Sequence, residues 1–342
     1  MGSREGSRMR VGGDLGFCPH LYASSPHGCQ ARILQTLGVP LTYQDLICYG
    51  GFAFRIQVHE RLCPSAGHPR VGTMCVENSD RAIGWETRFF ESFPWTSPKA
   101  DRAAWEAEAH DAIRESVLRG VPVHYGSEED GLIVGCSARG DEWECLHPYH
   151  ADGRERFLYE EATGFAGGAW PWGIAVWTRP SPERLEEREL LCAALRQAVT
   201  MAADEAAGDF RVGDAGYEHW LAWLHGLDQG SLELPEWGRM GNAWCFAVLI
   251  HCRGIAGSWL AEQAERVPAA AAAELRTAAG CWSESAAALA HGLQRPSDLA
   301  PGPGSGANWT TTMRAEQRRR LDRARAADAE AVAALDRALA WL

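Results

Sequence analysis

A cysteine that could act as a nucleophile stands near the start of a predicted helix, in the sequence HGCQ at residues 27–30. Apolar spacing and the stop at Gly38 predict this helix over residues 28–37. At a helix N-terminus, unpaired N–H groups and the helix dipole favour the thiolate of Cys29. Gly28 leaves room for a substrate carbonyl, and the backbone N–H of Cys29 is a candidate oxyanion donor. The alternative is that Cys29 is a small buried hydrophobe.

A cysteine nucleophile needs a base and usually a third group that orients the base. Two apolar runs, 132–136 and 143–146, predict an antiparallel hairpin. Asp130 precedes the first strand and His147 follows the second, so both are expected at the same end of the sheet. This predicts His147 as the general acid/base and Asp130 as its orienting group. Both residues also fit an ordinary turn and strand exit. The whole set of candidates is His124, Asp130, His147 and His150.

The elements that must position these residues differ between the two halves of the chain. The first half is mixed, with predicted helices at 43–48 and 98–118 and predicted strands at 52–56, 121–125 and 173–177 in addition to the hairpin. After about residue 182 the chain is rich in alanine and has helical apolar spacing, which favours a helical bundle. A surface loop is expected at 296–307. We expect a flexible N-terminus (1–16), an α+β domain with an antiparallel sheet (17–180) and an all-α domain (181–342).

Composition and charge limit the classes of function. The chain has 342 residues and a formal charge of −12, which argues against binding to nucleic acid or to anionic membranes. Its eleven cysteines are scattered, odd in number and without a CxxC pair, so neither a disulfide framework nor a zinc ribbon is indicated. We find no signal-peptide pattern, no apolar run of about 20 residues and no phosphate-binding loop. A cytoplasmic protein without a metal or other cofactor is expected.

The order of several short motifs resembles a known family. They are HGCQARIL, GGFAFRI, GVPVHYG, DGLIVGC and WECLHPY, and they resemble the papain-like, C39-peptidase-like fold, more narrowly the N-terminal domain of the butirosin biosynthesis protein H group. YEHWLAWL and NAWCFAVLIHCRGIAGSWLAEQAE are similar to the helical region that often follows that domain. The resemblance covers about residues 18–289.

The resemblance implies a papain-like domain whose cysteine, here Cys29, accepts an acyl group from a peptide or a carrier-protein thioester. In the family pattern a histidine begins the first hairpin strand and Asp or Asn before proline ends the second. Here Asp130 and His147-Pro148 stand in those places, so the two roles look exchanged. Either His147 acts as the base from the orienter's position, or the site has been repurposed, or catalysis is lost. No glutamine lies shortly upstream of Cys29, which argues against ordinary peptidase activity.

The expected function is therefore acyl transfer or amide-bond formation on an amine-bearing small molecule in a natural-product pathway, through a Cys29 acyl-thioester. Two alternatives stay open, namely a non-covalent cyclase or isomerase with a histidine base, and an inactive protein that binds a small molecule or carrier protein. Expected partners are a small amine or peptide-like substrate, an acyl carrier protein and a second copy of the chain. The residues expected to line the substrate site are His124, Tyr125, Glu128, Tyr149, His150, Phe52, Arg55 and Trp172.

Overall fold

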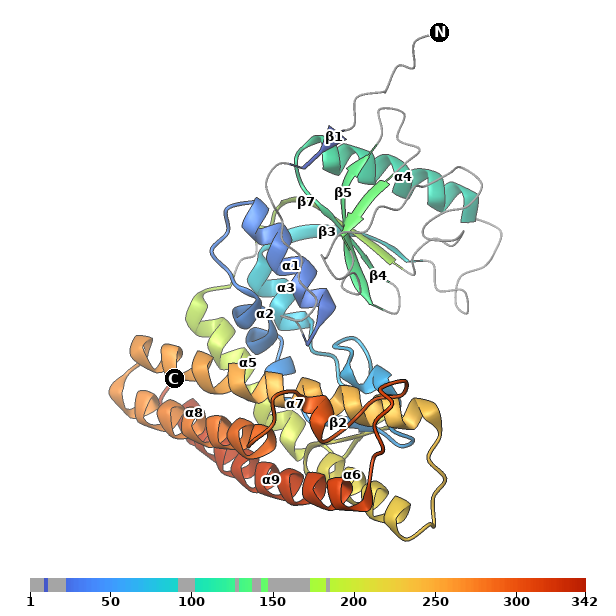
Figure 1. The fold of residues 1–342 in the computed structure, drawn as a ribbon. Helices are drawn as coiled ribbons and strands as arrows, with labels where there is room; N and C mark the ends of the chain where they lie inside the picture. The colour runs from blue at the N-terminus through green and yellow to red at the C-terminus, as the bar shows by residue number, and fades with distance from the viewer. Residues whose placement is uncertain are drawn as a thin grey trace. The chain divides into compact units, whose positions relative to one another are not determined.

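Two separate antiparallel sheets mark two structural units in the chain (Figure 1). The structure is a computed structural model that describes residues 9–11, 23–91, 102–126, 129–136, 143–146, 173–182 and 185–342. Unit 1 comprises Met1–Tyr43 and Ile83–Arg184, and unit 2 comprises Gln44–Ala82 and Leu185–Leu342. The predicted mixture of an antiparallel α+β part and a helical C-terminal part is confirmed.

The sheet of unit 1 is built around a strand that is buried along its whole length. That strand is β5 (Asp130–Cys136), and the strand order is β1 (Met9–Arg10), β5, β4 (Val123–Gly126), β7 (Gly173–Pro180) and β3 (Trp85–Glu91), with β6 (Trp143–Leu146) also paired to β5. The predicted β5–β6 hairpin is confirmed by antiparallel pairing of Leu132 with Leu146. β3 was not predicted, because its sequence mixes charged and aromatic residues without clean alternation.

Two helices of unit 1 pack against β4 and β5. They are α1 (Ser25–Thr36) and α4 (Arg102–Leu118). α1 carries Pro26 in its first turn, where a missing N–H costs nothing, and it ends before Gly38, whose φ of +68° suits glycine. α1 begins three residues earlier than the predicted start at residue 28. Cys29 therefore lies in the second turn of the helix.

The segment Gln44–Ala82 belongs to unit 2, whereas the sequence suggests that the first domain runs without a break to residue 180. Its strand β2 (Gln57–His59) pairs with β9 (Phe210–Val212), which also pairs with β8 (Ala206–Ala207). The predicted strand at 52–56 is wrong, since Phe52–Phe54 forms a 3₁₀ turn after Gly51 and the strand begins at Gln57. Pairing between strands about 150 residues apart cannot be read from local patterns. The same segment holds all but the first residue of α2 (Tyr43–Tyr49), a 3₁₀ turn at Pro64–Gly67 and all but the last residue of α3 (Glu77–Ile83).

The rest of unit 2 is a bundle of long helices, as predicted. They are α5 (Glu187–Ala203), α6 (Gly213–Asp228), α7 (Glu236–Gln263), α8 (Ala269–Ala290) and α9 (Thr311–Leu339). In Figure 1, α8 in orange and α9 in red lie side by side over most of their length. Alanines on both helices are buried, which lets the two backbones approach closely.

The helical stretch Glu236–Arg266 is long and apolar enough to cross a membrane by length and composition alone. The sequence expectation that no stretch reaches this length is therefore revised. Half of its most apolar window is buried inside the bundle, where Phe246, Leu249 and Leu260 join the core. The central helix of a soluble protein has these same properties, and the structure is compatible with one.

Two buried polar networks give the bundle its register. Arg253 of α7 contacts Asp328 of α9 at 2.8 Å and the carbonyl oxygen of Ala53 at 2.8 Å, and the Tyr217 hydroxyl donates to the same carboxylate at 2.7 Å. Burial and then the Asp328 charge hold the pKa of Tyr217 well above its ordinary value. Because a buried charge without a partner is costly, this network fixes α6, α7 and α9 against the 44–82 segment.

The second network joins the indole N–H of Trp220 and the Gln317 amide to the side-chain oxygen of Asn242, at 2.8 and 2.9 Å. All three side chains are buried, so each polar group needs such a partner. Asn242 and Arg253 of the most apolar helix thus both have partners on other elements of the bundle.

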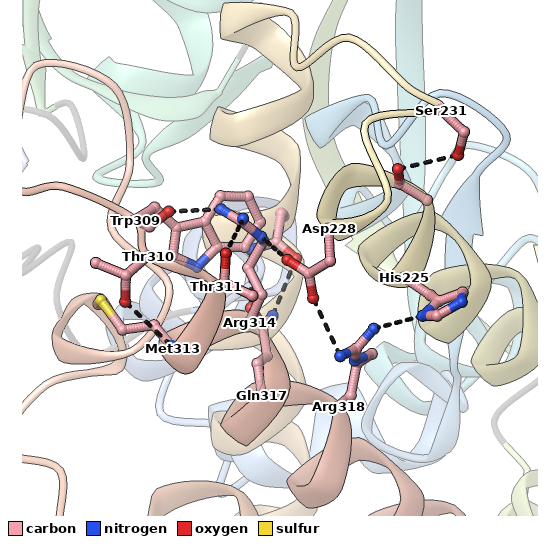
Figure 2. A network of polar contacts seen from close by, with 12 residues as sticks. His225, Asp228, Ser231, Trp309, Thr310, Thr311, Met313, Arg314, Gln317 and Arg318 are labelled. Atoms are coloured by element: carbon pink, nitrogen blue, oxygen red, sulfur yellow. Dashed lines mark hydrogen bonds and ion pairs between the residues drawn. The ribbon is translucent and has the colours of Figure 1, made fainter.

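A third cluster joins the end of α6 to the start of α9 (Figure 2). Asp228 accepts from Arg314 at 2.5 Å and pairs with Arg318 at 3.0 Å. Arg314 also donates to the carbonyl oxygen of Trp309 at 2.5 Å, and the Trp309 ring packs against Trp223 with centroids 6.2 Å apart.

The segment 296–307 is better anchored than the predicted surface loop. Leu299 and Ala300 are buried, and Arg239 donates to the carbonyl oxygens of Pro301 and Ala307. The segment therefore packs onto the bundle.

Two glycines in the interior of bundle helices offer a matched test of packing. A Cβ on Gly241 would lie 1.7 Å from the Leu62 carbonyl oxygen, whereas a Cβ on Gly280 meets nothing within 4 Å. Gly241→Ala is expected to destabilise the chain by about 1–3 kcal/mol. Gly280→Ala is expected to stabilise it by about 0.5–1 kcal/mol, through helix propensity alone. Urea unfolding measures both, and equal effects would contradict the packing of α7 on Leu62.

Stability should fall at alkaline pH because two core thiols resist ionisation. Burial raises the pKa of Cys245 and Cys252 to about 12, from an ordinary value of 9.0. The unfolded chain loses these protons above pH 9 while the folded chain keeps them. The contribution of these thiols to the free energy of unfolding is therefore complete below pH 9. Above pH 9 it falls by about 1.4 kcal/mol per pH unit for each thiol.

Urea unfolding at pH 8, 9.5 and 10.5 tests this, with Cys245→Ala as the comparison. The variant should show a shallower decline than the wild type. Parallel declines would show that the Cys245 thiol ionises in the folded chain as readily as in the unfolded chain.

Candidate active site

The clearest polar arrangement in unit 1 is a buried histidine–aspartate pair on neighbouring strands. His124 Nε2 lies 2.5 Å from Asp130 Oδ2, and both side chains are about 3% exposed. In the antiparallel register of β4 and β5, Gly126 stands opposite Asp130 and His124 opposite Leu132. His124, Gly126 and Asp130 therefore share one face of the sheet, since side chains two residues apart point the same way.

Gly126 is the reason this diagonal pair can form. A Cβ on Gly126 would lie 3.2 Å from Asp130 Oδ1, closer than most real Cβ contacts. With only hydrogen at this position, the Asp130 carboxylate lies across Gly126 and reaches His124.

The pair orients the imidazole. In the described part of the chain, Asp130 is the hydrogen-bond partner of the His124 ring, through Nε2. A carboxylate on one ring nitrogen fixes the tautomer that leaves the other nitrogen, Nδ1, able to accept a proton. This is how a protein holds a histidine as a general base.

The N-terminus of α1 contacts the start of β5, where Asp130 lies. The Ser25 hydroxyl accepts from the backbone N–H of Asp130 at 3.1 Å and lies 2.5 Å from Glu129 Oε2. Cys29 follows Ser25 by four residues, so both side chains lie on one face of α1, about 5–6 Å apart at their Cβ atoms. Cys29 is fully buried and lies one turn from the residue that contacts Asp130.

The entry to α1 is held by its own polar contacts. The Tyr43 hydroxyl accepts from the N–H groups of Ala23 and Ser24 at 2.9 and 3.2 Å. The Ser24 hydroxyl lies 2.7 Å from Nδ1 of His27, which is also buried. These bonds fix the chain just before the turn that carries Cys29.

The position of Cys29 in the second turn corrects one expectation. N–H groups without a helical partner belong to the first turn, and the dipole effect weakens beyond it. The backbone N–H of Cys29 is therefore not positioned as an oxyanion donor, and the helix dipole favours its thiolate less than expected. Any activation of this thiol depends more on a neighbouring base.

Two of the predicted substrate-lining residues of unit 1, His124 and Tyr125, lie on opposite faces of the sheet. Tyr125 follows His124 on β4 and so points to the opposite face of the sheet. Its ring packs over Gly131, where a Cβ would lie 2.4 Å from the phenol oxygen. Of the two, His124 is on the face that carries the Asp130 side chain.

Phe52 and Arg55 lie in unit 2 and have a local role there. The Arg55 guanidinium lies 4.9 Å from the Phe52 ring and donates to four backbone carbonyls. These belong to Ala66, His68, Val71 and Thr73. Both residues line a cavity of about 20 Å³, which has room for about one water molecule and not for a substrate. Their contacts therefore support the fold of residues 66–73.

The remaining predicted site residues lie outside the described residues. They are Glu128, His147, Tyr149, His150 and Trp172. β6 ends at Leu146 opposite Leu132, so the predicted closeness of this strand end to the start of β5 holds as far as Leu146. The assignment of His147 as the base stays a prediction.

Sequence reasoning missed the partnership of Asp130 with His124 and the contacts of Ser25 and Glu129. The available signal was the short connection in sequence between the predicted strands 121–125 and 132–136, which is typical of a hairpin. Pairing these two strands would have placed His124 and Asp130 on one face. The contacts of Ser25 span more than 100 residues and carry no local signal.

A larger hollow of about 410 Å³ lies in unit 2, lined by Arg81, Leu185, Arg188, Glu189, Cys192, Ala193, Arg196 and Leu342. It contains none of the predicted site residues. Within the described ranges, no cluster of three or more His, Cys, Asp or Glu side chains is suited to a metal ion.

No protein-family model matches this chain, and no curated protein matches it either.

Proposed function

We propose that unit 1 is a papain-like domain that transfers acyl groups through a thioester on Cys29. The observation that carries the proposal is the buried His124–Asp130 pair on β4 and β5, the two strands against which the Cys29 helix packs. A thiol, a base and a group that orients the base are what nucleophilic cysteine chemistry requires.

The roles follow from the hydrogen bonds. His124 is the general acid/base in place of the expected His147, since Asp130 is bonded to His124. Nδ1 of His124 takes the thiol proton as the Cys29 sulfur attacks the acyl carbonyl. The imidazolium then protonates the leaving thiol of the donor, which leaves a thioester on Cys29. An amine attacks that thioester, its proton passes to His124, and Cys29 is released as a thiol together with the amide.

This assignment accounts for the exchanged residues in the hairpin. The family pattern expects a histidine where this chain has Asp130. A histidine on the preceding strand, two positions away on the same face, supplies the partner instead. Asp130 and His124 thus form the acid–imidazole pair, at strand positions that differ from those of the family pattern. The helix before the antiparallel strands fits the same family pattern.

The proposed substrates are an acyl thioester donor, from a carrier protein or peptide, and an amine-bearing small molecule in a natural-product pathway of the cytoplasm. The formal charge of −12 favours a cationic amine as acceptor.

A second candidate is a cyclase or isomerase that uses the His124–Asp130 pair without a covalent intermediate. The full burial of Cys29 and its place beyond the first helical turn favour this alternative. A histidine base needs only the pair itself, so the alternative loses nothing when Cys29 is replaced.

Intact-mass spectrometry with an acyl N-acetylcysteamine thioester tests the proposal. The wild type should gain one acyl mass, and Cys29→Ala should gain none. His124→Asn should slow acylation by about 10²–10⁴-fold, the usual contribution of a general base. Cys145→Ala, which removes another buried thiol of unit 1, should behave as the wild type.

His147→Asn decides between the two histidines. Wild-type acylation in this variant supports His124 as the base, and loss of acylation restores the sequence prediction of His147. An acyl adduct that persists in Cys29→Ala would overturn the proposal.

A further inference from the structure

The Ser25 hydroxyl joins the helix of Cys29 to the strand of Asp130. It accepts from the Asp130 backbone N–H at 3.1 Å, and its own proton is directed to Glu129 Oε2 at 2.5 Å. Both partners are more than 100 residues away in sequence. Ser25 is the first residue of α1, and Asp130 is the first residue of β5.

Local helix capping does not explain these bonds. The N-cap of α1 is Ser24, and no side-chain capping bond is present there. The Ser24 hydroxyl instead contacts His27 within the same helix. Ser25 therefore makes a side-chain contact between the start of α1 and the start of β5, while the Ser24 hydroxyl is engaged with His27.

The two contacts act together. A hydroxyl has one proton and two acceptor lone pairs. Because the proton is directed to the Glu129 carboxylate, a lone pair is available to the Asp130 N–H. A carboxylate acceptor also strengthens the bond. The backbone position of Asp130 relative to α1 is thus set by a bond that Glu129 orients.

We propose that Ser25 is a positioning residue for acyl transfer, setting the placement of the His124–Asp130 pair relative to Cys29. The inference rests on the proposed function above. Ser25 acts through Asp130 at the strand and through the helix turn that leads to Cys29. A misplacement of about 1 Å can reduce the rate of a reaction by about 100-fold, so a single hydroxyl in this position is enough to matter.

The test uses the full chain and three variants. Ser25→Ala removes both contacts, and Ser25→Thr keeps a hydroxyl. Ser116→Ala is the matched control, since Ser116 is another buried serine of unit 1 whose hydroxyl bonds the Val121 carbonyl at 3.0 Å. Thermal unfolding and circular dichroism establish that each variant is folded.

The first readout does not depend on acyl transfer. NMR follows the imidazole N–H signal of His124 and the hydrogen exchange of the Asp130 amide. We expect Ser25→Ala to shift or lose the His124 signal and to speed exchange at Asp130 by at least about tenfold. Ser25→Thr and Ser116→Ala should retain the wild-type values.

The second readout is the rate of acylation of Cys29 by the same thioester. Ser25→Ala should be about 10- to 100-fold slower than the wild type, with rescue to within a few fold in Ser25→Thr. If the wild type is not acylated at all, the proposed function fails, and the NMR readout still tests the placement.

If the wild type is acylated and Ser25→Ala matches it in rate, His124 signal and Asp130 exchange, the role of Ser25 is overturned while the proposed function stands. Should Ser25→Ala fail to fold, Glu129→Ala replaces it. That variant leaves the hydroxyl in place without its orienting acceptor. It should show the same changes to a smaller degree, and wild-type values in both readouts would contradict the inference.

Discussion

The hydrogen bond between His124 and Asp130 is the interaction on which the account of unit 1 depends. It lies among buried groups, where an unpaired histidine or carboxylate would be costly, so the two side chains hold one another in place. The antiparallel register of β4 and β5 and the absence of a side chain at Gly126 allow it to form. Ser25 then ties the same strand end to the helix that carries Cys29. The chemistry proposed for Cys29 requires each of these placements.

Unit 2 also buries polar and charged groups, and each of them needs a partner. Arg253, Asp328 and Tyr217 bring charged and polar groups into the bundle, and their partners come from three helices and from the segment 44–82. Removal of one partner would leave a buried charge, so the network specifies one arrangement of the helices. It explains why a segment that precedes most of unit 1 in sequence folds with the C-terminal bundle.

Local patterns predicted the elements that have clean periodicity. The α2 helix, the β5–β6 hairpin and the apolar helices of the bundle appear in the sequence as regular apolar spacing. The same patterns failed where a long-range contact decides the outcome. Phe52 and Phe54 alternate like strand residues but form a 3₁₀ turn, while β2 begins later and finds its partner about 150 residues away. Cys29 and Asp130 were singled out by residue type, and the structure shows Asp130 in a buried pair with His124. The partner of Asp130 could not be fixed, because strand register is set by packing and not by sequence spacing.

The central claim is that His124, held by Asp130, is the base for Cys29. The most direct measurement is a crystal structure of the chain with an acyl group or a small alkylating probe on Cys29, in which the distance from the Cys29 sulfur to Nδ1 of His124 is determined. We expect a distance within about 4 Å, with the Asp130 bond to Nε2 retained. A separation of about 8 Å, or the imidazole of His147 in contact with the sulfur in place of His124, would contradict it.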